Sequence, residues 1–218
     1  MGENEKNIIE QTLKAKRVFS LPNCVDLQDA ESFERVYNWI EPLNIGYIGR
    51  IAVTKGMEDL LQACRELKAK QIPFIVKLAG AEEVKDSFLP LFDSYLGHQF
   101  IYAGIVSVEK KNIFLKSLDV FVLPSYFEGL PMSLLECMSY GAVPVTTNVG
   151  SIGDVVEDCK NGLFIKMKDT DSIIEVLTNL NNDREMLSRL GNEARATIFQ
   201  NFNPHKYIQN LNIIYGMA

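Results

Sequence analysis

Two glutamates are the residues whose type and spacing suggest chemistry most directly. Glu128 follows a predicted strand and turn, and Glu136 lies eight positions later, within a predicted helix. If the spacing were helical throughout, the carboxylates would lie about 12 Å apart along the axis and roughly 80° apart around it, so both could face one side. Carboxylates accept paired hydrogen bonds from vicinal hydroxyls. The pair therefore favours a ligand with a sugar ring at each end and a diphosphate between them.

The helix start between these glutamates predicts a phosphate position, because a helix N-terminus offers unpaired N–H groups and partial positive charge. A structural alternative is that Glu128 caps the helix and that Glu136 is a solvated helix residue. Glu136 has mainly apolar sequence neighbours, however, where an unpaired carboxylate would be costly. The surrounding Pro-Ser, Glu-Gly-Leu-Pro and Leu-Leu-Glu pattern favours a binding role for both carboxylates.

Two further segments carry residues suited to anions. Arg50 follows a predicted strand directly after Gly49, and Lys55 begins the next predicted helix. Two cations beside a helix terminus suit a diphosphate, although either cation alone would usually be an ordinary surface charge. A later loop contains Gly150 and Ser151, which predicts a phosphate or sugar contact, a helix start capped by Ser151, or both.

The elements that must position these residues alternate between strand-like and helix-like segments from residue 44 onward. Short strands between longer helices imply repeated βαβ units, and hence an α/β, Rossmann-like parallel sheet with helices on both faces. Ligands in such folds bind beyond the carboxyl ends of the strands, where the candidate loops lie. We expect strands at 44–48, 73–79, 99–102, 120–123, 143–146 and 163–165, and helices at 54–70, 82–95, 107–117, 130–140 and through most of the C-terminal end.

The first 43 residues break this alternation. A strand-like piece at 18–21 precedes Pro22-Asn-Cys-Val-Asp26, and residues 29–40 form an amphipathic stretch that ends in Trp39. This part of the chain is too irregular for a second domain. We interpret it as a linker with an edge element.

Composition and charge exclude several classes of protein. The chain has 218 residues, a net charge of −6 and 47% hydrophobic residues, so a core can form, whereas general nucleic-acid binding usually needs a basic face. No apolar run approaches the ~20 residues that span a membrane, and no secretory signal is expected. The four cysteines form no CxxC pair or Cys/His cluster, so we expect free thiols in a reducing cytosol and no zinc.

Other motifs carry less weight. Asp169-Thr-Asp171 matches an Asp-x-Asp metal pattern, but it precedes a predicted helix, so Asp169 or Thr170 is expected to be an N-cap. Ser125 has no evident histidine and aspartate partners for a triad. The sequence has no Walker phosphate loop and no GxGxxG motif, which argues against an NTPase or a dehydrogenase.

Together, Gly-Arg…Lys-Gly, Leu-Pro-Ser-x-x-Glu-Gly-Leu-Pro and Glu-x7-Glu resemble the C-terminal, donor-binding domain of retaining glycosyltransferases of family four, the group 1 transferases, which have the GT-B architecture. The resemblance begins near Leu21, and Pro22-Asn-Cys-Val-Asp26 is similar to the linker between the family's two domains. It implies that residues 1–20 are the tail of an N-terminal acceptor domain. Residues 21–43 would be linker and edge element, and residues 44–218 the nucleotide-sugar-binding domain with its C-terminal helices.

The resemblance also implies roles for individual residues. Arg50 and Lys55 would hold the donor diphosphate, and Glu128 would bind hydroxyls of the transferred sugar. These three residues would form the catalytic set. Glu136 would bind the ribose. Further substrate contacts would involve Gly49, Gly129, Leu130, Pro131, Gly150 and Ser151. The expected reaction is hexosyl transfer with retained configuration, in the cytoplasm, with no cofactor and no essential metal.

Three positions depart from the family pattern. Cys24 replaces a linker glycine, Ser151 replaces the second glycine of a Gly-Gly pair, and Asp154 stands near the usual glutamate. The predicted last helix carries an apolar stripe that packs either on an N-terminal domain or on its own sheet; the stripe is Tyr207, Ile208, Leu211, Ile214 and Tyr215.

The expected partners are the nucleotide-sugar donor and the N-terminal domain, with any peripheral membrane contact made only through that domain. Other classes of function stay open: a noncatalytic Rossmann-like interaction module, a sugar-nucleotide epimerase, or a sugar phosphorylase of the same architecture. The sequence leaves the base, the sugar, the acceptor and the oligomeric state undetermined.

Overall fold

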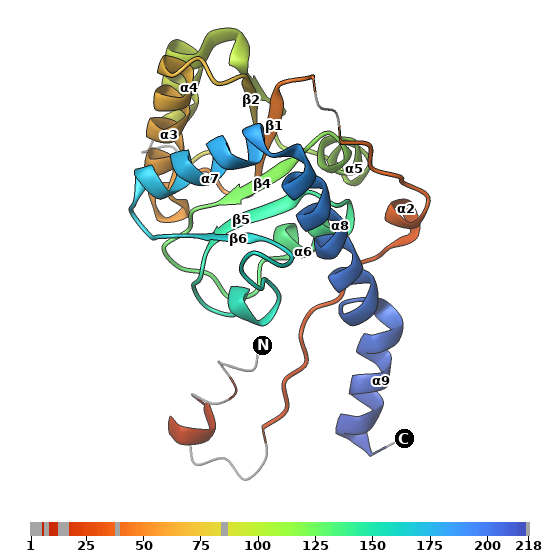
Figure 1. Ribbon diagram of the computed structural model, residues 1–218. Coiled ribbons are helices and arrows are strands. Elements are labelled where there is room, and N and C mark those ends of the chain that lie inside the picture. Colours follow the sequence, from red (N-terminus) through yellow and green to blue (C-terminus); the bar gives the residue numbers. More distant parts are fainter. Residues whose placement is uncertain (1–5, 7–8, 13–17, 38–39, 84–86, 217–218) are drawn as a thin grey trace.

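The computed structural model describes residues 6, 9–12, 18–37, 40–83 and 87–216 (Figure 1). Its centre is a six-stranded sheet of order β3-β2-β1-β4-β5-β6, in which all neighbouring strands are parallel. The predicted α/β, Rossmann-like fold class is therefore confirmed. The strands are β1 (Leu43–Ile48), β2 (Phe74–Ala79), β3 (Phe100–Tyr102), β4 (Val120–Leu123), β5 (Val143–Thr147) and β6 (Leu163–Ile165).

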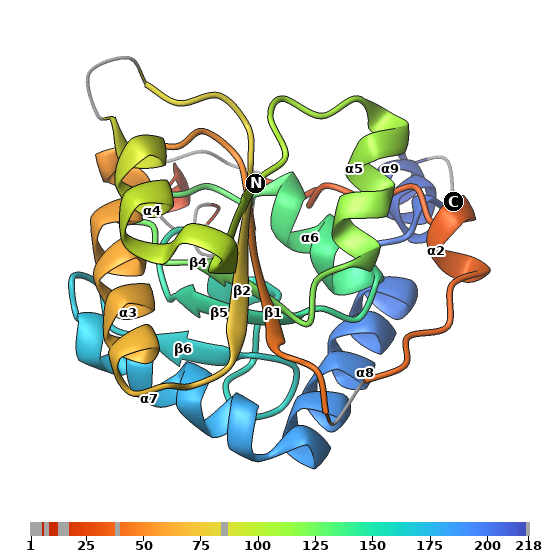
Figure 2. The same cartoon turned by 90° about the horizontal axis from the view of Figure 1, so that it is seen from above.

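Helices cover both faces of this sheet, as Figure 2 shows from above. One face carries α3 (Met57–Ala69) and α4 (Phe88–Leu96), and the other carries α5 (Val108–Lys116) and α6 (Met132–Ser139). The next two helices pack on different helices of these two layers: α7 (Thr170–Asn182) packs against α3, and α8 (Arg184–Asn201) packs against α6. Every residue of β4 and β5 is buried, which explains why β4 is apolar throughout and β5 is apolar from Val143 to Val145.

The apolar spacing predicted for the first helix is confirmed in α3. Leu60, Leu61, Cys64 and Leu67 are all buried there. Burying a leucine side chain contributes about 1.5–3 kcal/mol, so this face alone accounts for much of the attachment of α3 to the sheet. The buried face positions the preceding loop, which contains Arg50 and Lys55.

The helix predicted over 82–95 begins later than expected, at Phe88. Pro90 has no N–H and is tolerated only in the first turn of a helix, so a helix starting at residue 82 would be broken by it. Glu82 instead bridges to Ile51, and its side chain accepts a hydrogen bond from the N–H of Leu89 at 2.8 Å.

The strand predicted at 18–21 is wrong, because this segment has no regular secondary structure. The chain that follows it pairs with the end of a helix instead of the sheet: the N–H of Val25 donates to the carbonyl of Phe202 at 2.9 Å. Among the described residues of the predicted amphipathic stretch, only those in α2 (Gln28–Glu31) are helical, and Trp39 lies outside the described residues.

The last helix, α9 (Pro204–Tyr215), continues from α8 past the end of the sheet (Figure 1). Asn203 caps it by accepting a hydrogen bond from the N–H of Lys206 at 2.8 Å. None of its residues is buried, and Tyr215 is 72% exposed. The alternative that the apolar stripe packs on its own sheet is therefore wrong.

Candidate active site

The strand order of the sheet reverses beside β1. The chain goes from β1 outward to β2 and β3, and then returns to β4 on the other side of β1, so the connections after β1 and β4 diverge. Ligands of open α/β sheets bind at this point, beyond the carboxyl ends of the strands. The loops at 49–56 and 124–131 meet there and hold most of the predicted site residues.

Backbone contacts fix these two loops against each other. The N–H of Tyr126 donates to the carbonyl of Thr54 at 3.0 Å. Gly56 has a φ of +69°, and a Cβ there would lie 2.1 Å from the carbonyl oxygen of Pro124. Only glycine permits this approach. Side chains from both loops are thus held in one site.

The loop after β5 joins the same edge. The N–H of Ser151 donates to the carbonyl of Gly129 at 3.1 Å. Gly150 has a φ of +59°, and a Cβ there would lie 2.0 Å from the carbonyl oxygen of Glu128. The structure therefore places the predicted residues Gly150 and Ser151 directly beside Glu128 and Gly129.

Lys55 and Glu128 form an ion pair at this edge. The Nζ of Lys55 lies 2.6 Å from Oε1 of Glu128, and the side chains are 18% and 11% exposed. The hydroxyl of Ser125 donates to the same carboxylate oxygen at 2.7 Å. Ser125 is itself held by Thr147, whose hydroxyl donates to the backbone carbonyl of Ser125 at 2.6 Å. The lysine and the carboxylate are thus preorganised, with their charges matched.

Tyr47 supports the start of the β1 loop. Its hydroxyl donates to the carbonyl of Arg50 at 2.6 Å, and the side chain is buried. Burial raises the pKa of Tyr47 well above its usual value, and the negative charge of Glu128 adds to this effect. The phenol therefore stays neutral and fixes the backbone of Arg50.

The Arg50 side chain points to solvent. It is 63% exposed, and its Nη1 lies 3.1 Å from Oε1 of Glu83, in the loop after β2. The N–H of the preceding Gly49 donates to the carbonyl of Ala79 at 3.0 Å, which continues the pairing of β1 with β2. An exposed ion pair contributes at most ~1 kcal/mol, so Arg50 can exchange Glu83 for an anion at little cost.

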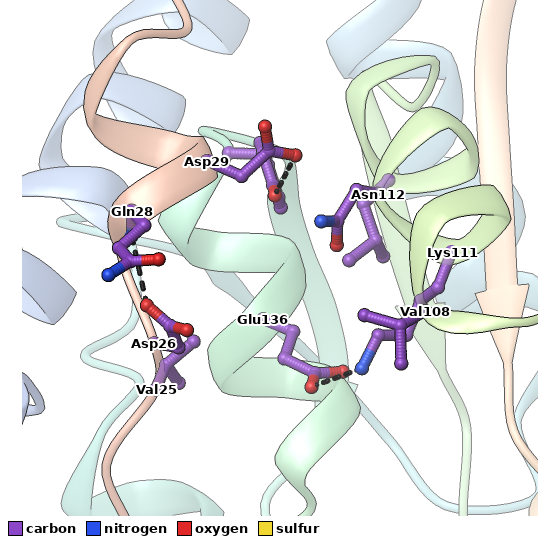
Figure 3. Close-up of a pocket in the computed structure, with 10 residues that line it drawn as sticks. Val25, Asp26, Gln28, Asp29, Val108, Lys111, Asn112 and Glu136 are labelled. Atoms are coloured by element: carbon purple, nitrogen blue, oxygen red, sulfur yellow. Dashed lines mark hydrogen bonds and ion pairs between the residues drawn. The ribbon is translucent and has the colours of Figure 1, made fainter.

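Glu136 lies in a pocket of about 220 Å³ between the segment at 25–29, α5 and α6 (Figure 3). Its Oε1 lies 2.7 Å from the Nζ of Lys111, and the two side chains are 19% and 27% exposed, respectively. The lining residues are Val25, Asp26, Gln28, Asp29, Val108, Lys111, Asn112, Leu115, Glu136 and Tyr140.

The helical spacing assumed between the two glutamates does not hold over its first half. The helix α6 begins at Met132, and Pro131, expected in the first turn, is the N-cap with an extended backbone (φ −68°, ψ 128°). A residue before proline disfavours the helical conformation, so Leu130 cannot extend the helix backward. The two carboxylates therefore do not share one helix face. Each has its own lysine instead.

The two predicted helix caps have different outcomes. Asp169 caps α7 as expected, because it accepts a hydrogen bond from the N–H of Ser172 at 3.0 Å. Ser151 precedes the 3₁₀ turn Ile152–Asp154, but its ψ of 17° is not the extended value of an N-cap and its hydroxyl makes no capping bond. The capping interpretation of Ser151 is wrong. Its Oγ is buried without a hydrogen-bond partner among the described residues.

Three side chains at these positions are missing from the predicted set: Lys111, Ser125 and Thr147. Ser125 is considered in the sequence only as a triad nucleophile, whereas in the structure it donates to Glu128. One signal could have found Lys111. A carboxylate with apolar neighbours needs a cation, and the helices before and after β4 lie on the same face of the sheet.

The described residues offer neither a metal site nor a reactive buried thiol. In the described part of the chain, no group of three or more His, Cys, Asp or Glu residues could hold a metal ion. Cys64 and Cys137 are buried, and burial raises the pKa of both thiols, which makes them poor nucleophiles. Across the same residues, no helix is both long and apolar enough to cross a membrane.

A parallel sheet of this order, with its candidate residues gathered at the switch point, defines an α/β domain of the Rossmann-like class. The chain belongs to the glycosyl transferases group 1, whose family model matches residues 31–197. The family expected from the motifs is thereby confirmed.

Relatives with curated descriptions agree with this assignment. The chain is 28% identical over 170 residues to a putative colanic acid biosynthesis glycosyltransferase, WcaL, of Salmonella typhimurium, covering 74% of this chain and 42% of that protein. It is 25% identical over 172 residues to the capsular polysaccharide biosynthesis glycosyltransferase CapM of Staphylococcus aureus, covering 79% and 45%. The chain thus spans about half the length of the curated relatives it matches.

Solved structures show the same fold. TarM of S. aureus superposes with a TM-score of 0.85 at 19% identity, covering 99% of this chain and 43% of TarM. The C-terminal domain of a group 1 family protein, LpcC, of Francisella tularensis gives a TM-score of 0.70 at 21% identity, covering 81% of this chain and 98% of that domain. Both superpositions show the same Rossmann-like fold as this chain.

Proposed function

We propose that this chain is the donor domain of a retaining glycosyltransferase. It binds a nucleoside-diphosphate sugar and, with an N-terminal acceptor domain, transfers the sugar to an acceptor. The observation that carries the proposal is the short Lys55–Glu128 pair at the switch point. Two proteins of the same fold support a nucleotide-sugar donor, since TarM was crystallised with UDP and HepE of Anabaena with UDP-glucose.

The donor diphosphate binds at the edge formed by the loops after β1 and β4. Lys55 turns from Glu128 to a phosphate oxygen, and the exposed Arg50 leaves Glu83 for the other phosphate. Glu128 then accepts hydrogen bonds from hydroxyls of the transferred sugar. Backbone and side-chain contacts to the sugar and the phosphates come from Gly49, Gly129, Leu130, Pro131, Gly150 and Ser151.

The ribose end of the donor lies toward α6, where Glu136 accepts hydrogen bonds from the ribose hydroxyls. The helix α6 begins at Met132, so the N–H groups of Met132 and Ser133 have no helical acceptor. These groups attract the diphosphate between the two sugars.

The catalytic step breaks the bond between the sugar and the diphosphate. Negative charge builds on the leaving diphosphate, and Lys55 and Arg50 stabilise it. Removing one such preorganised group typically costs about 2.7–4 kcal/mol of barrier, a hundredfold or more in rate. Because the counter-charge comes from side chains, we expect no essential metal and no other cofactor, and we expect a hexose as the transferred sugar.

The domain division is part of the proposal. Residues 1–20 would end an acceptor domain, residues 21–43 would link the two halves, and residues 44–218 would form the donor domain. A cytoplasmic location follows from the expected reducing environment of the free thiols.

Calorimetric titration of the chain with UDP, GDP and ADP tests this proposal. We expect one of them to bind, and Arg50→Ala and Lys55→Met each to weaken that binding about tenfold or more, as the loss of a charge-assisted hydrogen bond implies. Lys70→Met is the matched control, because Lys70 is exposed at the far end of α3. A folded chain that binds none of the three nucleotides would rule the proposal out.

A further inference from the structure

The Lys111–Glu136 pair carries an inference that rests on the proposed function and extends it. Lys111 lies near the start of α5 and Glu136 in the middle of α6, and Figure 3 shows the two side chains pointing at each other across the pocket. The Nζ–Oε1 distance is 2.7 Å. Each helix thus contributes one charge, and the two charges pair with each other where both side chains are partly buried.

The geometry of this pair leaves Glu136 partly available. Lys111 bonds to Oε1, and within the described residues no other side chain is recorded on the carboxylate, so Oε2 can accept from a ligand. A carboxylate has about four lone-pair sites and an ammonium group has three donors. Lys111 can therefore hold Glu136 and still donate to a hydroxyl that Glu136 binds.

The surroundings restrict what this carboxylate can do. Leu115 contributes a buried apolar wall to the pocket, and the Glu136 side chain is 19% exposed. Without Lys111, a carboxylate in this place would face a higher desolvation cost and would lose its fixed orientation. A fixed orientation matters for two vicinal hydroxyls, because both hydrogen bonds need the same carboxylate geometry.

We propose that Lys111 is a positioning residue for the ribose: it orients Glu136 and thereby makes the domain select ribonucleotides over 2′-deoxyribonucleotides. The ribose 2′-hydroxyl is the group whose recognition depends on the orientation of Glu136, whereas the phosphates are bound elsewhere. A purely structural ion pair would leave this selection unchanged, and a purely electrostatic role would alter the binding of both nucleotides equally.

The test is calorimetric titration with UDP and 2′-deoxy-UDP, or with GDP or ADP and its 2′-deoxy analogue if that base binds more tightly. A hydrogen bond to a charged group implies that the wild-type chain prefers the ribonucleotide by about tenfold or more. We expect Lys111→Met to reduce this preference to about threefold or less and Lys111→Arg to restore part of it. Thermal unfolding identifies any variant that fails to fold. If Lys111→Met fails to fold, the ribonucleotide preference of Lys111→Arg, which keeps the charge, decides the test.

Lys110→Met is the matched control, because Lys110 is the next residue of α5 and is exposed. It should keep the wild-type preference. If Lys111→Met weakens both nucleotides equally, or leaves the ratio unchanged, the inference is overturned while the proposed function stands. If the wild-type chain binds no nucleoside diphosphate, the proposed function fails and the inference fails with it.

Discussion

Replacing Glu128 by glutamine removes the charge that now holds Lys55. In the structure Lys55 is 2.6 Å from this carboxylate, so a diphosphate must compete with Glu128 for the lysine. Glutamine keeps the shape of the side chain and one acceptor oxygen but carries no charge. We therefore expect Glu128→Gln to bind UDP more tightly than the wild-type chain and to bind the matching UDP-sugar more weakly.

The size of the effect follows from the geometry of the pair. Two unit charges 2.6 Å apart attract by about 6 kcal/mol at an effective dielectric constant of 20, but desolvation cancels most of this. The net value of a charge-assisted hydrogen bond is about 1.5–3 kcal/mol, and glutamine retains roughly half of it. The released lysine should strengthen UDP binding by about 1 kcal/mol, or roughly fivefold.

The effect on the UDP-sugar has the opposite sign. Glu128 accepts hydrogen bonds from sugar hydroxyls in the proposed complex, and glutamine replaces a charged acceptor with a neutral one. A loss of about 1.5 kcal/mol corresponds to roughly tenfold weaker binding of the sugar-bearing donor. The UDP-sugar carries the same diphosphate and gains the same fivefold from the released lysine, so its net binding weakens about twofold, and the two affinities diverge by about tenfold in the variant.

Calorimetry with UDP, UDP-glucose and UDP-galactose measures this divergence directly. Glu175→Gln is the control for the chemical change, because Glu175 is an exposed residue of α7. If Glu128→Gln weakens UDP and the UDP-sugars to the same degree, the competition between carboxylate and phosphate for Lys55 is refuted.

Three further predictions concern the fold around the site. Gly150→Ala should lower the free energy of unfolding and weaken UDP-sugar binding. Gly97→Ala is the control, because Gly97 has a φ of +56° and open space around it, so it should show only the backbone strain of roughly 1 kcal/mol. Equal losses of stability in chemical unfolding would contradict the close approach at Gly150. Burial raises the pKa of Tyr37 to about 12 from its usual 10, so between pH 10 and 12 the folded state keeps a proton that the unfolded state loses, and the free energy of unfolding should fall over this range. Tyr37→Phe should reduce the steepness of this fall by at most about 1.4 kcal/mol per pH unit. An unchanged slope of stability against pH would show that Tyr37 does not contribute. Asn203→Ala should reduce the helicity measured by circular dichroism. It should leave the melting temperature of the core unchanged, because no residue of α9 is buried. A lower melting temperature would show that α9 supports the sheet.

Much of the fold could be predicted because local pattern and burial agree. The strands β4 and β6 have the predicted bounds, since continuous apolar runs there are bounded by residues that cannot continue a strand or pack in it. The start of α4 differs from the prediction because Pro90 has no N–H and is tolerated only in the first turn of a helix.

The site could be predicted only in part, since its contacts join distant segments. Motifs placed Lys55 and Glu128 on loops of the same edge, but nothing local fixes the ion pair between residues 73 positions apart. The partners Ser125 and Lys111 depend on loop and helix packing. The two glutamates are not separated by helical spacing, because residues 128–131 precede the start of α6 at Met132.

A crystal structure of the chain with bound UDP, or with GDP or ADP if that nucleotide binds more tightly, tests the central claim most directly. We expect the Nζ of Lys55 to leave Glu128 and to lie within hydrogen-bond distance, about 3 Å, of a phosphate oxygen, with Glu136 on the ribose hydroxyls. A diphosphate bound away from the loops after β1 and β4, with Lys55 still paired to Glu128, would contradict it.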